Sequence, residues 1–415
     1  RRRVAEDPLH EPAQRALMRL YAQAGNRAAA LRQYEECVRV LAEEAAMEPE
    51  EETRTLLERI RTGSKCEGVD GAEDGAAIDE AKATPLPQHN LPEQVTTFVG
   101  RRRELEQVRQ RLDDPRCRLL TIVGPGGIGK TRLAIRAAQQ QAELFTDGVY
   151  YVDLAPVETP NHLAPAILRA MDSPDYGAAD AERRLCDSLR DKMLLLVLDN
   201  FEHLMEGADL LPKLLRSASG VKLLVTSRER LSLGGEWLEP LDGLETPPGG
   251  GPDDSGATRT APQELPETAP DLEAYDATRL FVECMRRLRP DFAPSDDEAV
   301  VVAAVCRMLE GMPLGIELAS EWTRVLSMRD VQRQMAHGLE FLTGSLRDAP
   351  QRHHSMRAVC DHSWSLLSDR ERSILRQMSV FRGGCTGEAA AAVTGASLAD
   401  LRQLADKSWL RSTPA

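Results

Sequence analysis

One stretch limits what this chain can fold into more than any other. The apolar run at residues 119–123 stops abruptly at a glycine-rich turn that ends in Lys130 and Thr131. Together with Gly124 and Gly129, these two residues meet the pattern G-x-x-x-x-G-K-[ST]. A β-branched strand precedes the turn and a helix-favouring segment follows it, which is the context that the pattern requires. The stretch therefore predicts a phosphate-binding loop.

The residue types in this loop suit a phosphate chain. Such a chain carries several negative charges, which the inward-pointing N–H groups of a tight loop can bind at the start of a helix. Gly126 and Gly127, with the two glycines of the pattern, let the backbone come close to it. We expect Lys130 to contact the β- and γ-phosphates and the Thr131 hydroxyl to bind the bridging Mg²⁺. The predicted ligands are ATP or ADP with Mg²⁺.

Composition sets the broad class. With 415 residues, a net charge of -14 and 28% charged residues, the chain is globular and too long for one ordinary domain. The acidic total argues against coating nucleic acid through bulk charge. Eight cysteines without a C-x-x-C pair indicate a reducing, cytoplasmic compartment, and no apolar run is long enough to cross a membrane. The chain begins without Met and ends as a strand-like segment starts, so we expect a fragment of a longer protein.

Residues 1–61 show a helical pattern, broken near Gly25 and near Pro49. The residues that fall at the spacings of a tetratricopeptide (TPR) repeat are Leu17, Tyr21, Ala30, Tyr34 and Cys37. This favours a TPR-like interaction module, with a plain helical bundle as the alternative. Residues 62–90 hold almost no large apolar side chain, which predicts a flexible linker.

Within this helical part, residues 30–41 (ALRQYEECVRVL) and residues 53–60 (TRTLLERI) resemble the end of the bacterial transcriptional activator domain of antibiotic-pathway regulators. In that family the domain follows a winged-helix DNA-binding domain, which this sequence does not contain. The resemblance implies that DNA is reached only through a domain missing from this fragment.

After the phosphate loop, strand and helix patterns alternate. The predicted elements are residues 148–154, 161–171, 181–189, 192–199 and 221–226. Such alternation is typical of a parallel sheet with helical crossovers. The predicted fold class is an α/β P-loop NTPase core over residues 91–244, flanked by all-α TPR-like and helical or winged-helix domains. Asp199 ends one of these strands, where its carboxylate would hold Mg²⁺ together with Thr131.

Five motifs in order resemble the signal-transducing (STAND) nucleotide-binding ATPases of the NB-ARC type. They are residues 98–105 (FVGRRREL), the phosphate loop, the strand ending in Asp199, the Thr-Ser-Arg ending at Arg228 and residues 311–314 (GMPL). The resemblance implies that Val99, Gly100 and Arg101 lie near adenine and ribose. It also implies that Pro313 covers the adenine ring and that Arg228 senses the γ-phosphate, so that Lys130, Asp199 and Arg228 form the reactive set.

Hydrolysis should be slow. Many hydrolysing relatives carry a second acidic residue after the Walker B aspartate, whereas this chain has Asn200, whose amide cannot accept a proton from water. Glu202 is the nearby carboxylate that could substitute.

The remaining sequence divides into three parts. Residues 245–270 are a low-complexity insertion rich in Pro, Gly, Asp and Thr. Residues 271–348 predict a helical ARC-like subdomain, with a capping box at Ser295 and Glu298. Residues 349–415 resemble a truncated winged-helix domain, with helices after the capping box of residues 368–371.

These features favour an ATP/ADP-dependent switch in a bacterial transcriptional regulator, in which ADP keeps the domains closed and ATP opens them for self-association. The alternative is a STAND signalling scaffold or sensor with no direct role in transcription. A metabolic kinase would need a substrate hydroxyl site and a lid, and neither pattern is present. The signal or protein ligand is not encoded in a recognisable motif, and no membrane partner is expected.

Overall fold

The computed structural model of the protein describes five long segments and a few residues near the N-terminus. The segments are residues 89–172, 180–248, 270–344, 355–381 and 384–411, and the other residues are Glu11, Arg15, Met18, Tyr34, Cys37, Val38, Pro49 and residues 53–57. The chain divides into two compact units, Arg1–Lys82 and Ala83–Ala415. Most of the predicted linker and most of the predicted insertion lie outside the described residues.

In the first unit, a polar contact joins Glu11 and Arg15 to Thr53, about 40 positions later in the chain. The Arg15 guanidinium donates to the Thr53 hydroxyl at 3.1 Å, and that hydroxyl donates to the Glu11 carboxylate at 2.6 Å. All three side chains are buried, and their backbones are helical. Three of the five residues of the predicted TPR spacing, Leu17, Tyr21 and Ala30, lie outside the described residues. The TPR-like packing therefore stays a prediction.

The second unit is built on a five-stranded parallel sheet in the order β2-β3-β4-β1-β5. The strands are β1 (Leu119–Val123), β2 (Val149–Asp153), β3 (Leu195–Asp199), β4 (Lys222–Ser227) and β5 (Glu236–Pro240). The parallel α/β core predicted from the sequence is thereby confirmed, although β5 was not predicted. Because parallel strands share one carboxyl edge, β1, β3 and β4 all end beside the phosphate loop.

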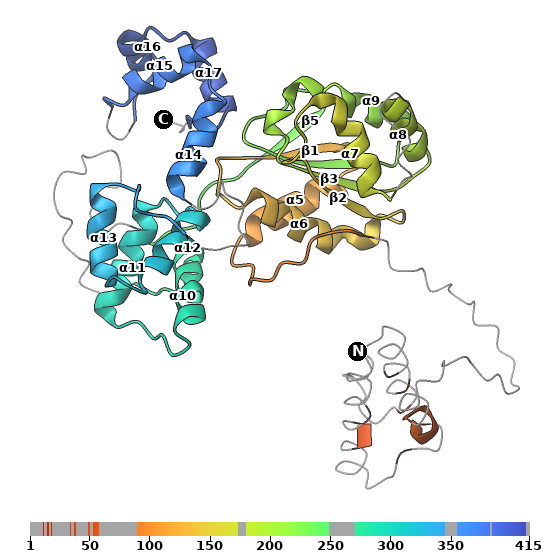
Figure 1. The fold of residues 1–415 in the computed structure, drawn as a ribbon, viewed down its shortest axis with the longest axis horizontal. Coiled ribbons are helices and arrows are strands. Elements are labelled where there is room, and N and C mark those ends of the chain that lie inside the picture. The colour runs from red at the N-terminus through yellow and green to blue at the C-terminus, as the bar shows by residue number, and fades with distance from the viewer. Residues whose placement is uncertain are drawn as a thin grey trace, which may run out of the picture. The chain divides into compact units, whose positions relative to one another are not determined.

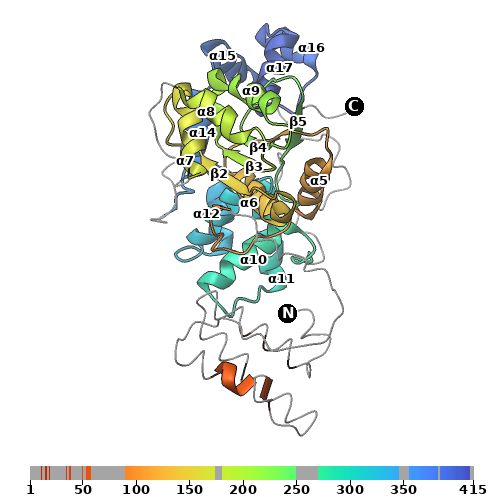
Figure 2. The same ribbon diagram turned by 90° about the vertical axis from the view of Figure 1, so that its right-hand side faces the viewer.

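Helices cover both faces of this sheet (Figures 1 and 2). They are α5 (Arg102–Asp113), α6 (Lys130–Gln141), α7 (Leu163–Ala170), α8 (Ala181–Leu189) and α9 (Leu210–Ser217). Successive residues of a strand point to opposite faces. Leu196 and Leu198 of β3 accordingly pack with α7, α8 and α9, whereas Leu195 and Val197 pack with α5 and α6. β3 is buried on both sides, which explains its uninterrupted apolar sequence.

Two groups of helices follow the sheet in the chain. The first contains α10 (Asp276–Leu288), α11 (Asp296–Met308), α12 (Pro313–Trp322) and α13 (Met328–His337), and the second contains α14 (Met356–Ser365), α15 (Asp369–Met378), α16 (Gly387–Thr394) and α17 (Leu398–Asp406). Helices α10 to α13 share one apolar core. The predicted capping boxes at the starts of α11 and α15 are both formed. Among the described residues, no helix has the length and apolar character needed to cross a membrane.

Candidate nucleotide-binding site

The phosphate loop joins β1 to α6 and has the backbone that its glycines permit. Gly127 and Gly129 have φ angles of 74° and 95°, in the left-handed region that favours glycine. Lys130 begins α6, and its ammonium donates to the carbonyl oxygens of Gly124 at 2.7 Å and Pro125 at 3.0 Å. The positive charge therefore lies over the loop, where phosphate is predicted to bind.

The Asp199 carboxylate lies at the centre of a network of hydroxyl groups. It accepts hydrogen bonds from Thr131 at 2.8 Å and Tyr151 at 2.9 Å, and from Thr226. The Asn200 side chain also donates to it, at 2.9 Å. Burial raises the pKa of the Asp199 carboxyl, although the hydrogen bonds from Thr226, Thr131 and Tyr151 oppose this shift. The two predicted metal ligands are thus adjacent.

These groups fit Mg²⁺ chemically. Mg²⁺ takes oxygen ligands and is usually held by one or two carboxylates together with substrate phosphates and water. The Thr131 hydroxyl and the Asp199 carboxylate provide such oxygens beside the phosphate loop. In the described part of the chain, no three His, Cys, Asp or Glu side chains gather in a way that could hold a metal ion.

Arg228 directly follows β4 and is buried next to a second charged residue. Its Nε donates to Oε1 of Glu202 at 3.0 Å, and each of the two residues is only 6% exposed. Its Nη1 donates to the Val359 carbonyl oxygen at 3.2 Å and to the Ser363 hydroxyl, both on α14. The predicted sensor residue thus connects the sheet edge to a helix more than 130 positions later in the chain.

Helix α14 packs directly on the phosphate loop. A β-carbon added at Gly126 would lie 2.6 Å from Cγ1 of Val359 and 3.0 Å from Cζ of Arg228. Both distances are shorter than van der Waals contact between carbon atoms. A larger residue at this position would force Val359 or Arg228 to shift, and the Arg228 guanidinium lies against the loop.

The start of α12 meets the other side of the loop. The Leu314 N–H donates to the Gly127 carbonyl oxygen at 3.2 Å, and Cγ of Pro313 would lie 3.9 Å from a β-carbon at Gly129. Pro313 occupies the first turn of α12, where its missing N–H is no loss. The structure therefore brings the Gly-x-Pro-Leu segment to the loop, while its contact with adenine stays a prediction.

The segment before α5 also reaches the site. Arg101 has a φ of 60°, and its guanidinium donates to the Ile128 carbonyl oxygen of the phosphate loop at 3.2 Å. Its backbone N–H donates to the Asp276 carboxylate at 3.1 Å, and a side chain at Gly100 would collide with that carboxylate. Val99 packs with the apolar core of α10 to α13. These residues link the loop to the helical part, and their role toward adenine and ribose stays a prediction.

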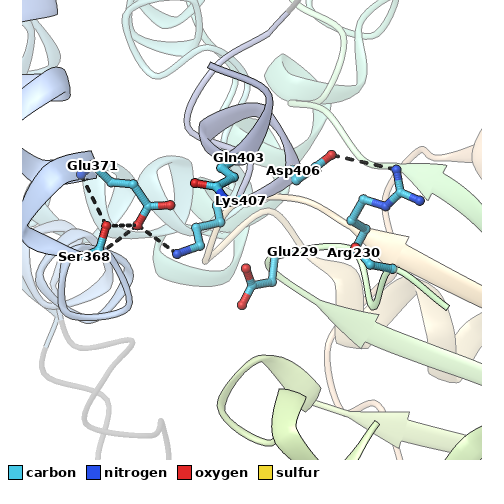
Figure 3. A pocket seen from close by; sticks show the side chains of 8 residues that line it. Glu229, Arg230, Ser368, Glu371, Gln403, Asp406 and Lys407 are labelled. Atoms are coloured by element: carbon cyan, nitrogen blue, oxygen red, sulfur yellow. Dashed lines mark hydrogen bonds and ion pairs between the residues drawn. The ribbon is translucent and has the colours of Figure 1, made fainter. Parts of the chain in front are cut away.

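A polar cavity of about 340 Å³ lies beside the residues that follow Arg228 in the chain (Figure 3). Its lining residues come from the chain after β4 and from α15 and α17 with their flanking residues, and they are Glu229, Arg230, Ser232, Ser368, Glu371, Gln403, Asp406 and Lys407. The Lys407 ammonium contacts the Glu371 carboxylate at 2.9 Å, and the Ser408 hydroxyl donates to the Arg228 carbonyl oxygen at 2.7 Å. Burial raises the pKa of Glu229. None of the phosphate-loop residues lines this cavity, which belongs to the contact between the strand end and the C-terminal helices.

Several site residues were not found by sequence reasoning. Tyr151 and Thr226 stand on strands beside β3, and Val359 and Ser363 stand on α14. A hydroxyl at the end of a predicted neighbouring strand was a usable signal for Thr226, whereas Tyr151 lies in the middle of β2 and had no such signal. No local pattern marked the two α14 residues.

Family models match two parts of this chain. Residues 1–61 match the bacterial transcriptional activator domain, and residues 113–232 match an AAA domain. Uncharacterized protein Rv0894 of Mycobacterium tuberculosis is 35% identical over 309 residues, which cover 74% of this chain and 71% of that protein.

Two larger relatives carry regulatory names. A putative HTH-type transcriptional regulator of Mycobacterium tuberculosis, Rv0890c, is 33% identical over 70% of this chain and 31% of its own length. The regulatory protein AfsR of Streptomyces griseus is 32% identical over 58% of this chain and 25% of its own length. The chain therefore spans a third or less of these two proteins.

Proposed function

We propose that this chain, which belongs to the same family as Rv0894 of Mycobacterium tuberculosis and contains a match to the AAA domain, is the nucleotide-dependent switch of a bacterial transcriptional regulator. The activator domain at residues 1–61 supports the link to transcription. The names of the HTH-type relative and of AfsR also support a regulatory role. With a net charge of -14, the chain itself is a poor DNA ligand, so we assign DNA contact to a winged helix outside this sequence.

The observation that carries the proposal is the position of Arg228. Its guanidinium lies against Gly126 of the phosphate loop, and the same side chain donates hydrogen bonds to Val359 and Ser363 of α14. A γ-phosphate bound beside this loop would offer Arg228 a stronger, charge-assisted acceptor than a carbonyl or a hydroxyl oxygen. ATP would therefore compete with α14 for one arginine, whereas ADP would not.

This competition gives a mechanism for the switch. With ADP, the contacts from Arg228 and from the following residues keep helices α14 to α17 on the sheet edge. With ATP and Mg²⁺, those helices are released and expose surfaces for self-association in the cytoplasm. Moving such an equilibrium from mostly closed to mostly open requires a differential affinity of about 5.5 kcal/mol. We assign the chain to the NB-ARC type of STAND switch, with at most slow hydrolysis because Asn200 stands where many hydrolysing relatives carry an acidic residue.

The chain's own groups have separate tasks in this function. Lys130 neutralises phosphate charge that the backbone N–H groups offset only in part. The Thr131 hydroxyl and the Asp199 carboxylate supply oxygen ligands for Mg²⁺, which would polarise the γ-phosphate when bound. Tyr151 and Thr226 fix the orientation of Asp199 through their hydrogen bonds.

Isothermal titration tests whether the site binds nucleotide. Replacing Lys130 with Ala should weaken ATP and ADP binding by roughly 1.5–3 kcal/mol, the range for a hydrogen bond to a charged group. Lys213→Ala is the matched control, because Lys213 is exposed on α9 and pairs only with Glu182 among the described contacts. Unchanged affinity of Lys130→Ala for both nucleotides would refute the proposal.

A further inference from the structure

The chain before α5 covers one edge of the sheet. β2 is the outermost strand on one side of the order β2-β3-β4-β1-β5, so one row of its backbone N–H and C=O groups faces away from β3. At this edge His89 pairs with Val149 in a parallel bridge. Two residues further along β2, the backbone groups of Tyr151 face the same way, because the direction of these groups alternates along a strand. Tyr151 therefore needs a partner from outside the sheet.

The side chain of Asn90 is that partner. Its Oδ1 accepts from the Tyr151 N–H at 2.5 Å, and its Nδ2 donates to the Tyr151 carbonyl oxygen at 3.0 Å. Nδ2 also donates to the carbonyl oxygen of Ala170, the last residue of α7, at 3.1 Å. An asparagine amide offers one acceptor oxygen and two N–H donors, and all three kinds of bond are used here. One side chain thus holds both backbone groups of Tyr151, as a paired strand would.

Tyr151 carries this contact into the nucleotide site. Its hydroxyl donates to Oδ2 of Asp199 at 2.9 Å, while Oδ1 of the same carboxylate accepts from Thr131 at 2.8 Å. A tyrosine side chain is rigid apart from two torsions, so the position of its hydroxyl follows the position of the strand backbone. A continuous series of contacts therefore runs from the sheet edge to the two predicted metal ligands.

The residues that follow Asn90 are anchored independently of Tyr151. The Gln94 side chain donates to the Arg132 carbonyl oxygen at 3.0 Å. The Arg132 guanidinium in turn donates to the carbonyl oxygens of Thr96 and Thr97 at 2.9 and 3.0 Å. Arg132 belongs to the first turn of α6, directly after the phosphate loop. Asn90 is thus held in place by its own segment and can act as a brace for β2.

We propose that Asn90 is a positioning residue of the nucleotide site, which sets the orientation of the Asp199 carboxylate through Tyr151. The inference rests on the proposed function, since its consequence concerns Mg²⁺ bound together with ATP. Mg²⁺ demands near-ideal octahedral geometry, so a small rotation of one carboxylate changes how well the metal is held. In the sequence, Asn90 lies between the activator-domain match at residues 1–61 and the AAA match at residues 113–232. The metal site is therefore braced from the segment that joins these two parts.

Isothermal titration of the full chain with ATP, with Mg²⁺ and with a chelator in its place, tests the inference. The readout is the Mg²⁺ response, which is the ratio of the two ATP affinities. Asn90→Ala should lower the Mg²⁺ response by about threefold to tenfold, as expected when neutral hydrogen bonds no longer hold a group. ATP affinity without Mg²⁺ should stay within about twofold of the parent value, because Lys130 and the phosphate loop are unchanged.

The chain offers a matched control for this variant. Thr97 lies on the same segment, but its hydroxyl donates to Glu283 of α10 at 3.2 Å and not to the sheet. Thr97→Val should therefore keep the parental Mg²⁺ response. Because Asn90 is exposed, its replacement by Ala removes hydrogen bonds without opening a cavity in the core.

A double variant separates positioning from plain support of the sheet edge. Tyr151→Phe removes the hydroxyl on Asp199 and should lower the Mg²⁺ response by about tenfold or more, the usual effect of losing a partner that orients a metal ligand. In that background Asn90→Ala should cause no further loss, because the route to Asp199 is already broken. A further loss equal to that of the single variant would show that Asn90 only supports the sheet edge, and would overturn the inference.

The outcomes also separate the inference from the proposed function. A parent chain that does not bind ATP refutes both, and one that binds ATP without a Mg²⁺ response refutes the inference while nucleotide binding stands. A parental Mg²⁺ response in Asn90→Ala refutes the inference alone. Should that variant fail to fold, Asn90→Asp decides, because its carboxylate keeps an acceptor for the Tyr151 N–H but donates no hydrogen bond. A Mg²⁺ response lowered by about twofold or more in Asn90→Asp supports the inference, and a parental response overturns it.

Discussion

Arg228 donates a hydrogen bond to the hydroxyl of Ser363, which stands 135 residues further along the chain. The bond joins the end of a central strand to a helix of the C-terminal part. The same guanidinium lies against the phosphate loop, so the contact between these two regions includes a side chain of the candidate nucleotide site. The chain thus has a direct physical link between its candidate binding site and its C-terminal helices.

Packing of α14 on the phosphate loop should respond to the size of residue 126. We predict that Gly126→Ala destabilises the second unit by about 1–3 kcal/mol, the usual range for overpacking, because the new methyl group meets Val359. Val359→Ala removes the opposing methyl groups and should recover part of that loss when it is combined with Gly126→Ala. Denaturant unfolding of both single variants and the double variant measures the coupling. Strictly additive effects would show that the two residues do not meet.

The Asp199 carboxylate should make nucleotide affinity depend on Mg²⁺. We predict that Asp199→Asn abolishes most of the increase in ATP affinity that Mg²⁺ gives the parent chain, because an amide oxygen is a weaker ligand for a hard cation. Asp153→Asn is the control, since Asp153 ends the neighbouring strand β2 but is exposed. Titration of ATP with and without Mg²⁺ measures the effect. An undiminished Mg²⁺ response in Asp199→Asn would assign the metal to other ligands.

Because some of its thiols are buried, the folded state should become less stable at alkaline pH. Burial raises the pKa of Cys117 and of Cys284 from 9.0 to about 11. A thiol whose pKa is higher in the folded state stabilises the fold below about pH 9, and this contribution is lost as the pH rises toward 11. At pH 8 we therefore expect iodoacetamide to modify the exposed Cys385 first and to spare these two, as mass spectrometry can show. Equal labelling of Cys117 and Cys385 would contradict the buried placement.

Much of the core was predictable because its signals are local. The apolar run of β3 ending in Asp199 and the glycine pattern before Lys130 each define a strand, its end and the chemistry beyond it. β5 was missed because its sequence, Glu236-Trp-Leu-Glu-Pro240, is short, carries two carboxylates and lies partly exposed. Its pairing with β1 depends on the tertiary fold, because the segment has no alternating pattern of apolar and polar residues that would predict a strand.

The contacts that give the site its proposed function were beyond sequence reasoning. Arg228 was expected to sense phosphate, and the structure does place it against Gly126. Its partners Glu202 and Ser363 could not be foreseen, because side-chain pairs between distant segments leave no periodic pattern. The Tyr151 hydroxyl on Asp199 was missed for the same reason, since the tyrosine fits an ordinary buried strand.

Arg228→Ala offers the most direct test of the switch. Small-angle X-ray scattering of the full chain should show a larger radius of gyration with ATP and Mg²⁺ than with ADP. In Arg228→Ala this difference should vanish, while ADP affinity stays within about threefold of the parent value, because ADP has no γ-phosphate for the arginine to bind. Arg116→Ala serves as the control, since Arg116 is exposed and pairs with Asp114 away from the loop. If Arg228→Ala expands with ATP as the parent does, Arg228 does not connect nucleotide to shape, and the account is wrong.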